Sequence, residues 1–202
     1  DPANNSRLAT VIAKAKAVNM PNDNIKRTID KALGAGNTDN FESVVYEGYG
    51  PAGVAVIVEA LTDNRNRTAP AVRHAFDKFG GNLGATGCVS WSFDRKGVLI
   101  IDNEEGDLEE DKVMEDALEA GASDFSNEGP VFQVYTEPDD FGTVCSALEE
   151  KGYTFLEANI SMVPQNYIVL EKEEDVTNME KMIDALEDND DIQNVYHNWQ
   201  QD

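Results

Sequence analysis

The chain is poor in cysteine and lacks long hydrophobic runs, and each shortage excludes a class of protein. Its two cysteines, Cys88 and Cys145, are too few and too distant for the disulfide framework of a small secreted domain. The longest strongly apolar stretch, residues 53–58, is strand-sized, far below the roughly 20 residues of a membrane-spanning helix. We therefore expect two buried thiols and a cytoplasmic protein that does not enter a membrane.

Patterns typical of catalysis and metal binding are lacking as well. The only histidines, His74 and His197, lie far apart, and no H-E-x-x-H, C-x-x-C or G-x-S-x-G pattern occurs. The acidic runs 104–111 and 188–191 do not place carboxylates and glycine in the order of a calcium loop, and we interpret them as solubilising loops. The sequence thus predicts no catalytic residue, no metal site and no cofactor.

A glycine-rich stretch invites comparison with phosphate-binding loops. Residues 48–53 read Gly-Tyr-Gly-Pro-Ala-Gly and satisfy the G-x-G-x-x-G pattern of dinucleotide sites. Such a site needs a helix directly after the loop, whereas strand-like residues follow here, and Pro51 has no amide hydrogen to offer a phosphate. We interpret the stretch as a structural turn.

Charge is abundant but unevenly distributed. The 202-residue chain has a net charge of -23. Residues 1–96 hold 12 Lys and Arg against 10 Asp and Glu, whereas residues 97–202 hold 4 against 29. The first part is therefore at +2 and the second at -25. Because phosphate backbones repel carboxylates, any contact with nucleic acid is expected from the first part.

Hydrophobic periodicity predicts an α+β fold. Apolar residues recur at helical spacing in two amino-terminal segments, ending with a helix over residues 21–33. After residue 41, short strands alternate with helices, as in ferredoxin-like units. The remaining expected elements are strands at 44–46 and 54–61, a helix at 66–79, a hairpin at 88–101 with its turn at 94–97, helices at 112–120, 138–151 and 173–187, and strands at 124–125, 131–135, 155–163, 167–170 and 192–197.

Cationic side chains gather around the helix predicted at residues 66–79. Its amino-terminal end attracts anions, and arginine suits phosphate. Ordinary solvated helix residues are the competing interpretation, and charge alone does not separate the two. The candidate nucleic-acid-binding residues are Arg65, Arg67, Arg73, His74 and Lys78, with Arg95 and Lys96 in the predicted turn and Lys26 and Arg27 on the earlier helix.

Several segments in one order resemble the YebC/PmpR family over essentially the whole chain. They are Asn19-Met-Pro21, Tyr46-Glu-Gly-Tyr-Gly-Pro51, Thr62-Asp-Asn-Arg-Asn-Arg-Thr68, Val72-Arg-His74, Gly80-Gly-Asn-Leu-Gly84, Met162-x-Pro164 and Val195-Tyr-His-Asn198.

The resemblance implies a helical segment and two ferredoxin-like α+β domains, one inserted into the other. We place the helical domain at residues 1–38, the discontinuous domain at 39–102 and 164–202, and the inserted acidic domain at 103–163. Family members are expected to carry a further basic helical extension ahead of residue 1. The sequence does not show it.

The resemblance also implies a non-enzymatic regulator of gene expression. Two activities compete: a translation factor that acts at the ribosome on proline-rich nascent sequences, contacting ribosomal or transfer RNA and ribosomal proteins, and a DNA-binding transcriptional regulator. We favour translation, because a body at -25 resists lying along duplex DNA. A small-molecule-binding module is a further alternative. We expect a monomer.

Overall fold

The computed structural model describes residues 8, 11–12, 15–16, 20–33 and 41–201, with only the backbone of residues 30–33. The chain forms two compact units, residues 1–40 and 41–202, which we treat separately. In the first unit, α2 spans Asn22–Leu33 and buries Ile25, as the apolar spacing predicts. The helix expected before it falls largely outside the described residues, although those that are described there, from Leu8 to Lys16, are helical.

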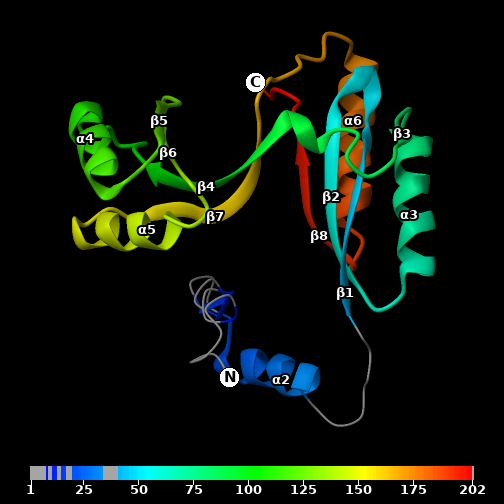
Figure 1. Cartoon of the computed structure of the whole chain (residues 1–202), viewed down its shortest axis with the longest axis horizontal. Helices are drawn as coiled ribbons and strands as arrows, with labels where there is room; N and C mark the ends of the chain where they lie inside the picture. Colours follow the sequence, from blue (N-terminus) through cyan, green and yellow to red (C-terminus); the bar gives the residue numbers. More distant parts are fainter. Residues whose placement is uncertain (1–7, 9–10, 13–14, 17–19, 34–40, 202) are drawn as a thin grey trace. The chain divides into compact units, whose positions relative to one another are not determined.

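The second unit contains two antiparallel sheets (Figure 1). The first has the strand order β3-β1-β2-β8, formed by Asn82–Leu83, Glu42–Tyr49, Ala55–Thr62 and Ile192–His197. Helices α3 (Arg65–Lys78) and α6 (Glu173–Glu187) pack on one face of it. Val56 and Val58 of β2, Phe76 of α3 and Met179 and Met182 of α6 form that core.

Strand β2 is buried on both faces, which explains its nearly continuous apolar sequence. Val54, Val56 and Val58 face the helices, while Ala55 and Ile57 face a second small core with Val89 and Phe93. A strand that is covered on both sides loses the alternation of apolar and polar residues.

The glycine-rich stretch 48–53 is a turn between β1 and β2. Residues Pro51–Gly53 form one 3-10 turn and β2 follows directly, so the loop does not lead into a helix as it does in a dinucleotide site. A side chain at Gly50 would meet Met179 Sδ at 2.8 Å and Met182 Cε at 2.9 Å, so the turn lies directly beneath α6. The turn interpretation agrees with the structure.

The second sheet has the order β5-β6-β4-β7, formed by Asp124–Asn127, Val131–Thr136, Phe93–Asp102 and Phe155–Pro164. Helices α4 (Glu110–Ala120) and α5 (Phe141–Glu150) pack on one face. The chain order β4-α4-β5-β6-α5-β7 is that of a ferredoxin-like unit. The first sheet begins instead with the hairpin β1–β2, but both sheets with their helices confirm the α+β prediction.

The predicted hairpin at residues 88–101 is wrong. Ser90–Ser92 form a 3-10 turn, and β4 runs without a break through the expected turn at 94–97, pairing with β7 from Phe93 to Ile101. Gly97, which we took for a turn residue, lies inside a strand. A side chain there would meet Thr136 Oγ1 and the Phe141 ring, so glycine lets α5 approach the sheet.

Strand β4 also changes where the inserted domain begins. Because β4 pairs with β6 and β7 and with no strand of the first sheet, the segment inserted between β3 and α6 begins at Phe93, not at residue 103. The strand expected at 167–170 is reduced to one isolated bridge between Ile168 and Trp199. None of the described helices has the length and apolar character needed to cross a lipid bilayer.

Replacing Gly97 with alanine tests the packing of α5 on β4. We expect Gly97→Ala to lower the free energy of unfolding by about 1–3 kcal/mol, because the added methyl group overpacks the site. Gly142→Ala in α5 is the control, since its added methyl group has nothing within 4 Å. Urea denaturation would measure both, and equal stability of the two variants would contradict the packing role.

Candidate nucleic-acid interface

The start of α3 is fixed by a hydrogen-bond network around Asp191. Asn64 caps the helix, accepting from the Arg67 amide at 3.2 Å. The Thr68 hydroxyl donates to the Asp191 carboxylate at 2.6 Å, and the Leu61 amide donates to the Asp191 carbonyl at 2.8 Å. Asp191 therefore joins the end of β2, the start of α3 and the turn before β8.

Arg67, a candidate phosphate contact, is committed to this network. Its guanidinium donates to Asp191 from Nη2 at 2.6 Å and from Nε at 3.1 Å, and Nη2 also donates to Asp63 at 2.9 Å. This two-pronged pairing uses the geometry that makes arginine suitable for phosphate. The structure thus gives Arg67 an internal anionic partner, and we remove it from the proposed binding surface.

The hydrogen bonds hold the pKa of Asp191 below its ordinary value. Those from Arg67 contribute most, followed by that from Thr68, and together they outweigh the burial that opposes ionisation. The Asp191 side chain is only 12% exposed, so water does not replace these partners. The acidic run that we interpreted as a solubilising loop therefore contains a structural carboxylate.

Arg73 and Lys78 of α3, with His74 between them, are free to meet an external anion. Arg73, His74 and Lys78 are exposed, and none makes an ion pair with any residue that the structure describes. His74 and Lys78 are four residues apart and share a face of the helix. Lys78 lies 5.0 Å from the centre of the Phe79 ring. Arg65 has a loose partner in Glu42 at 3.6 Å, with both side chains about half exposed or more.

Arg95 and Lys96 lie on opposite faces of β4, because neighbouring strand residues alternate. Arg95 is exposed and without an ion pair among the described residues. Lys96 donates to Glu137 at 2.8 Å, which raises the pKa of the lysine and holds it charged. The two therefore do not extend the α3 surface as a joint turn.

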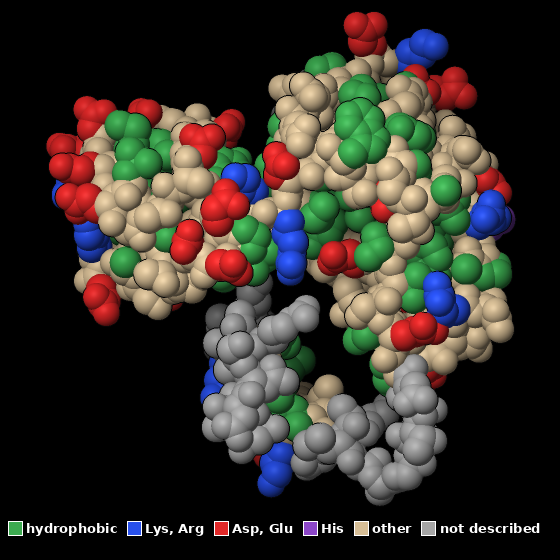
Figure 2. All heavy atoms as spheres, viewed as in Figure 1, with side chains coloured by type: hydrophobic (Ala, Val, Ile, Leu, Met, Phe, Trp, Pro, Cys, Tyr) green, Lys and Arg blue, Asp and Glu red, His purple; other side chains and the backbone are tan. Residues whose placement is uncertain are grey.

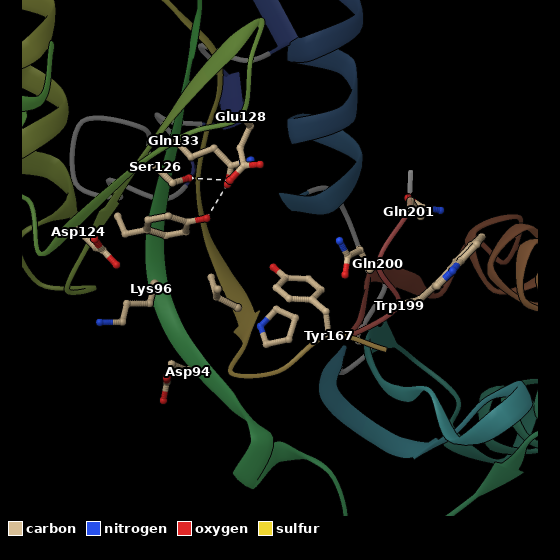
Figure 3. Close-up of a pocket in the computed structure, with 13 residues that line it drawn as sticks. Asp94, Lys96, Asp124, Ser126, Glu128, Gln133, Tyr167, Trp199, Gln200 and Gln201 are labelled. Atoms are coloured by element: carbon tan, nitrogen blue, oxygen red, sulfur yellow. Dashed lines mark hydrogen bonds between the residues drawn. The ribbon is translucent and has the colours of Figure 1, made fainter. Parts of the chain in front are cut away.

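Lys96 also lines an acidic hollow of about 770 Å³ on the face of the second sheet that α4 and α5 leave open. Figure 3 shows Lys96 together with Asp94 and Asp124. Tyr167 and Trp199 contribute aromatic rings to the same hollow. A phosphate would meet these carboxylates before it met the lysine, so Lys96 is a poor phosphate contact.

Lys26 and Arg27 belong to the first unit, where both are exposed on α2. Arg27 donates to Asn24 at 3.2 Å within its own helix. They form a cationic pair separate in sequence from α3.

Sequence reasoning missed Glu47, a buried carboxylate beneath the loop at residues 84–92. It accepts hydrogen bonds from the amides of Gly87, Val89 and Ser90 at 2.8, 3.0 and 2.9 Å. Burial raises the pKa of Glu47, but the amides outweigh it and the pKa lies below its ordinary value. Its position within the Tyr46–Pro51 segment gave no sign of this role.

Acidic residues are numerous around the second sheet and also on α6, which packs beside α3. On the face shown in Figure 2, Asp and Glu side chains are spread over the part formed by β5, α4 and α5. Within the described residues, no three His, Cys, Asp or Glu side chains are grouped to hold a metal ion. The structure thus combines a small cationic helix surface with a strongly acidic second sheet.

These features define an α+β protein of two sheets and an amino-terminal helical part, with one cationic helix as its candidate interface. The chain belongs to the TACO1/YebC family. Residues 41–199 match the model of the TACO1/YebC second and third domain, and residues 1–35 match that of the TACO1/YebC protein N-terminal domain.

Relatives match over the full length of the chain. A protein of Agathobacter rectalis, named a probable transcriptional regulatory protein, is 54% identical over 100% of this chain and 83% of its own length. A protein of the same name from Acetivibrio thermocellus is 58% identical over 98% and 82%. The crystal structure of a conserved hypothetical protein from Aquifex aeolicus has a TM-score of 0.86 at 43% identity, covering 99% of this chain and 82% of that one.

Asp191→Asn tests the network at the start of α3. At neutral pH we expect the free energy of unfolding to fall by about 1–3 kcal/mol, because Arg67 and Thr68 lose an ionised partner. Since folding lowers the pKa of Asp191, its contribution is complete above the unfolded value of about 3.9 and disappears as pH falls through the folded value. The gap between wild type and variant should therefore narrow below about pH 4.

Urea denaturation across a pH series measures this gap. Asp190→Asn is the matched control. Asp190 is the neighbour of Asp191 in the chain, but its side chain is exposed and forms no ion pair with the described residues. A gap that stayed constant with pH, or a control with the same loss, would show that the Asp191 carboxylate is not what stabilises the corner.

Proposed function

We propose that this protein is a non-enzymatic regulator of gene expression that binds nucleic acid, and that it acts in translation at the ribosome, where it relieves stalling on proline-rich sequences. The observation that carries the proposal is the cationic surface of α3, formed by Arg65, Arg73, His74 and Lys78, on a chain that is otherwise strongly acidic. The stalling substrate rests on the resemblance to the family.

The α3 surface suits a phosphate backbone. Three of its side chains are exposed and have no internal anionic partner, so binding would not first have to break an ion pair. Arg67, which does have such partners, holds the helix in place. A rigid helix that presents free cations loses little conformational entropy when it binds.

The distribution of charge favours a ribosomal site over duplex DNA. A long duplex on α3 would extend over acidic parts of this chain, among them α6, which contacts α3, and the second sheet, and the repulsion between carboxylates and phosphates would weaken binding. On a ribosome, the same sheet can face basic protein segments or solvent. The α3 surface is small and offers two arginines and one lysine, enough to contact a few phosphates.

Transcriptional regulation is the second candidate, and the name of the relatives favours it. It requires an element that enters a groove and reads base edges. The exposed α3 residues Arg73 and His74 are able to make such contacts. The acidic hollow beside Lys96 is the feature that a small-molecule-binding module would use.

Ribosome profiling in a strain that lacks the gene, with promoter occupancy measured in parallel, separates the two candidates. The proposal expects longer pauses at proline-rich codons and restoration by the wild-type gene. Unchanged pausing with altered promoter occupancy would refute the translational role and support the transcriptional one.

Removing charge from α3 tests the interface directly. We expect Arg73→Ala/Lys78→Ala to weaken binding to single-stranded RNA and to lower the slope of log affinity against log salt by about 0.7 for each lost phosphate contact. Lys172→Ala/Lys181→Ala is the matched control, because it removes two exposed cations from the acidic half. Equal losses in both double variants would show that only net charge matters.

A further inference from the structure

The most exposed large hydrophobic side chain among the described residues is a tryptophan that the α3 surface does not include. Trp91 is 71% exposed, although its residue type carries the largest apolar surface of all. The second tryptophan, Trp199, is 8% exposed and lies in the main core. A single exposed ring is common on protein surfaces, so the case for a ligand depends on what accompanies Trp91.

Trp91 is paired with a second aromatic residue, Tyr49. The indole Nε1 of Trp91 donates to the Cys88 carbonyl at 2.9 Å, and the Tyr49 hydroxyl donates to the same oxygen at 3.2 Å. The polar edges of both rings therefore converge on one atom. With their hydrogen-bonding groups satisfied internally, the rings offer mainly their apolar faces to a ligand.

The backbone that carries these rings is held firmly. The loop amides of Gly87, Val89 and Ser90 are bound by the buried Glu47 carboxylate. A side chain at Gly84 would meet Cys88 Sγ at 2.6 Å, so the loop also packs closely against itself. A ligand that stacks on these rings would not have to order the loop first.

The segment of chain that carries Trp91 has no charged side chain. Residues 79–93 contain no Asp, Glu, Lys, Arg or His, in a chain with 39 acidic residues. Glu47 is buried beneath the loop amides, and the next acid along the chain, Asp94, is hydrogen-bonded to Gln165 at 3.1 Å and faces the acidic hollow. A phosphate backbone can therefore approach the loop without meeting a free carboxylate of these residues.

The loop also adjoins the cationic end of α3. Tyr49 pairs with Asn82 of β3, and Lys78 precedes Asn82 by four residues, a length of chain that spans at most roughly 14 Å. The Gly81 amide bonds back to the Phe76 carbonyl at 2.8 Å, which keeps β3 close to the helix end. Lys78 and the two rings are thus close enough for one single strand of a few nucleotides to contact both.

We propose that Trp91 and Tyr49 form a stacking platform for an unpaired base of single-stranded RNA, next to the phosphate contacts of α3. The inference rests on the proposed nucleic-acid function and specifies its ligand. Stacking on an aromatic side chain requires a base that is not already stacked in a duplex. The platform therefore selects single strands over duplex DNA.

Fluorescence of the full chain tests the platform, because Trp91 is exposed while the other tryptophan is buried. Titration with a short single-stranded oligoadenylate should quench the emission of the wild type, and the same sequence in a duplex should not. In Trp91→Ala we expect the affinity for the single strand to fall by about 5- to 150-fold, the effect of losing one base–aromatic stack. Trp91→Phe should retain most of the affinity but lose the quenching.

Tyr167→Ala is the matched control, since Tyr167 is a 55% exposed aromatic residue in the acidic hollow, and it should bind as the wild type does. Circular dichroism verifies that each variant is folded. The salt slope of Trp91→Ala should equal that of the wild type, because no cation is lost, whereas Arg73→Ala/Lys78→Ala lowers it.

The outcomes distinguish this inference from the function on which it rests. If RNA binds without quenching and Trp91→Ala keeps its affinity, the platform is wrong while the nucleic-acid function stands. If the chain binds neither strand form, both are wrong. If Trp91→Ala changes only self-association in sedimentation velocity, the rings form a contact between copies of the chain and the platform is overturned.

Discussion

The carboxylate of Asp191 is the interaction on which the arrangement of the first sheet depends. It receives hydrogen bonds from Arg67 and Thr68 of α3, while its backbone carbonyl receives the amide of Leu61 at the end of β2. The chain leaves the first sheet after β3 and returns only with α6 and β8. The contacts of Asp191 with Arg67 and Thr68 therefore join residues more than 120 positions apart. They hold the two parts of the first sheet together, although the second sheet is inserted between them in the chain. Since it sits at the start of α3, it also fixes the orientation of the helix that carries the candidate interface.

This constraint divides the cationic residues into two groups with different physical roles. Arg67 pairs with Asp191 and Asp63 at the start of α3, where its guanidinium balances part of their negative charge. Arg73, His74 and Lys78 are exposed, away from the core that contains Val72 and Phe76, and the charges of Arg73 and Lys78 are available to a ligand. The same helix thus serves stability at its start and the proposed binding along its exposed face.

Glu47, near the end of β1, is a second buried carboxylate that stabilises the fold through hydrogen bonds. Glu47 binds three amides of the loop that carries Trp91, and so it turns a glycine-rich segment into a fixed support. In both places an acid in a strongly acidic chain is used internally, with its charge compensated by donors. Neither carboxylate contributes to the repulsive surface that the composition suggests.

The sequence by itself determined the α+β class, the positions of α2 and α3, the glycine turn before β2 and the resemblance to the family. Periodicity and turn residues are local properties, and local properties survive without knowledge of the fold. The sequence could not show that Gly97 lies inside a strand. A glycine that is required to avoid a clash with Phe141 cannot be distinguished, by residue type alone, from a glycine in a turn. Nor could the sequence separate Arg67 from Arg73. Only the tertiary structure decided which arginine meets Asp191, since that partner is distant in the chain and is brought near by the return of β8 to the first sheet.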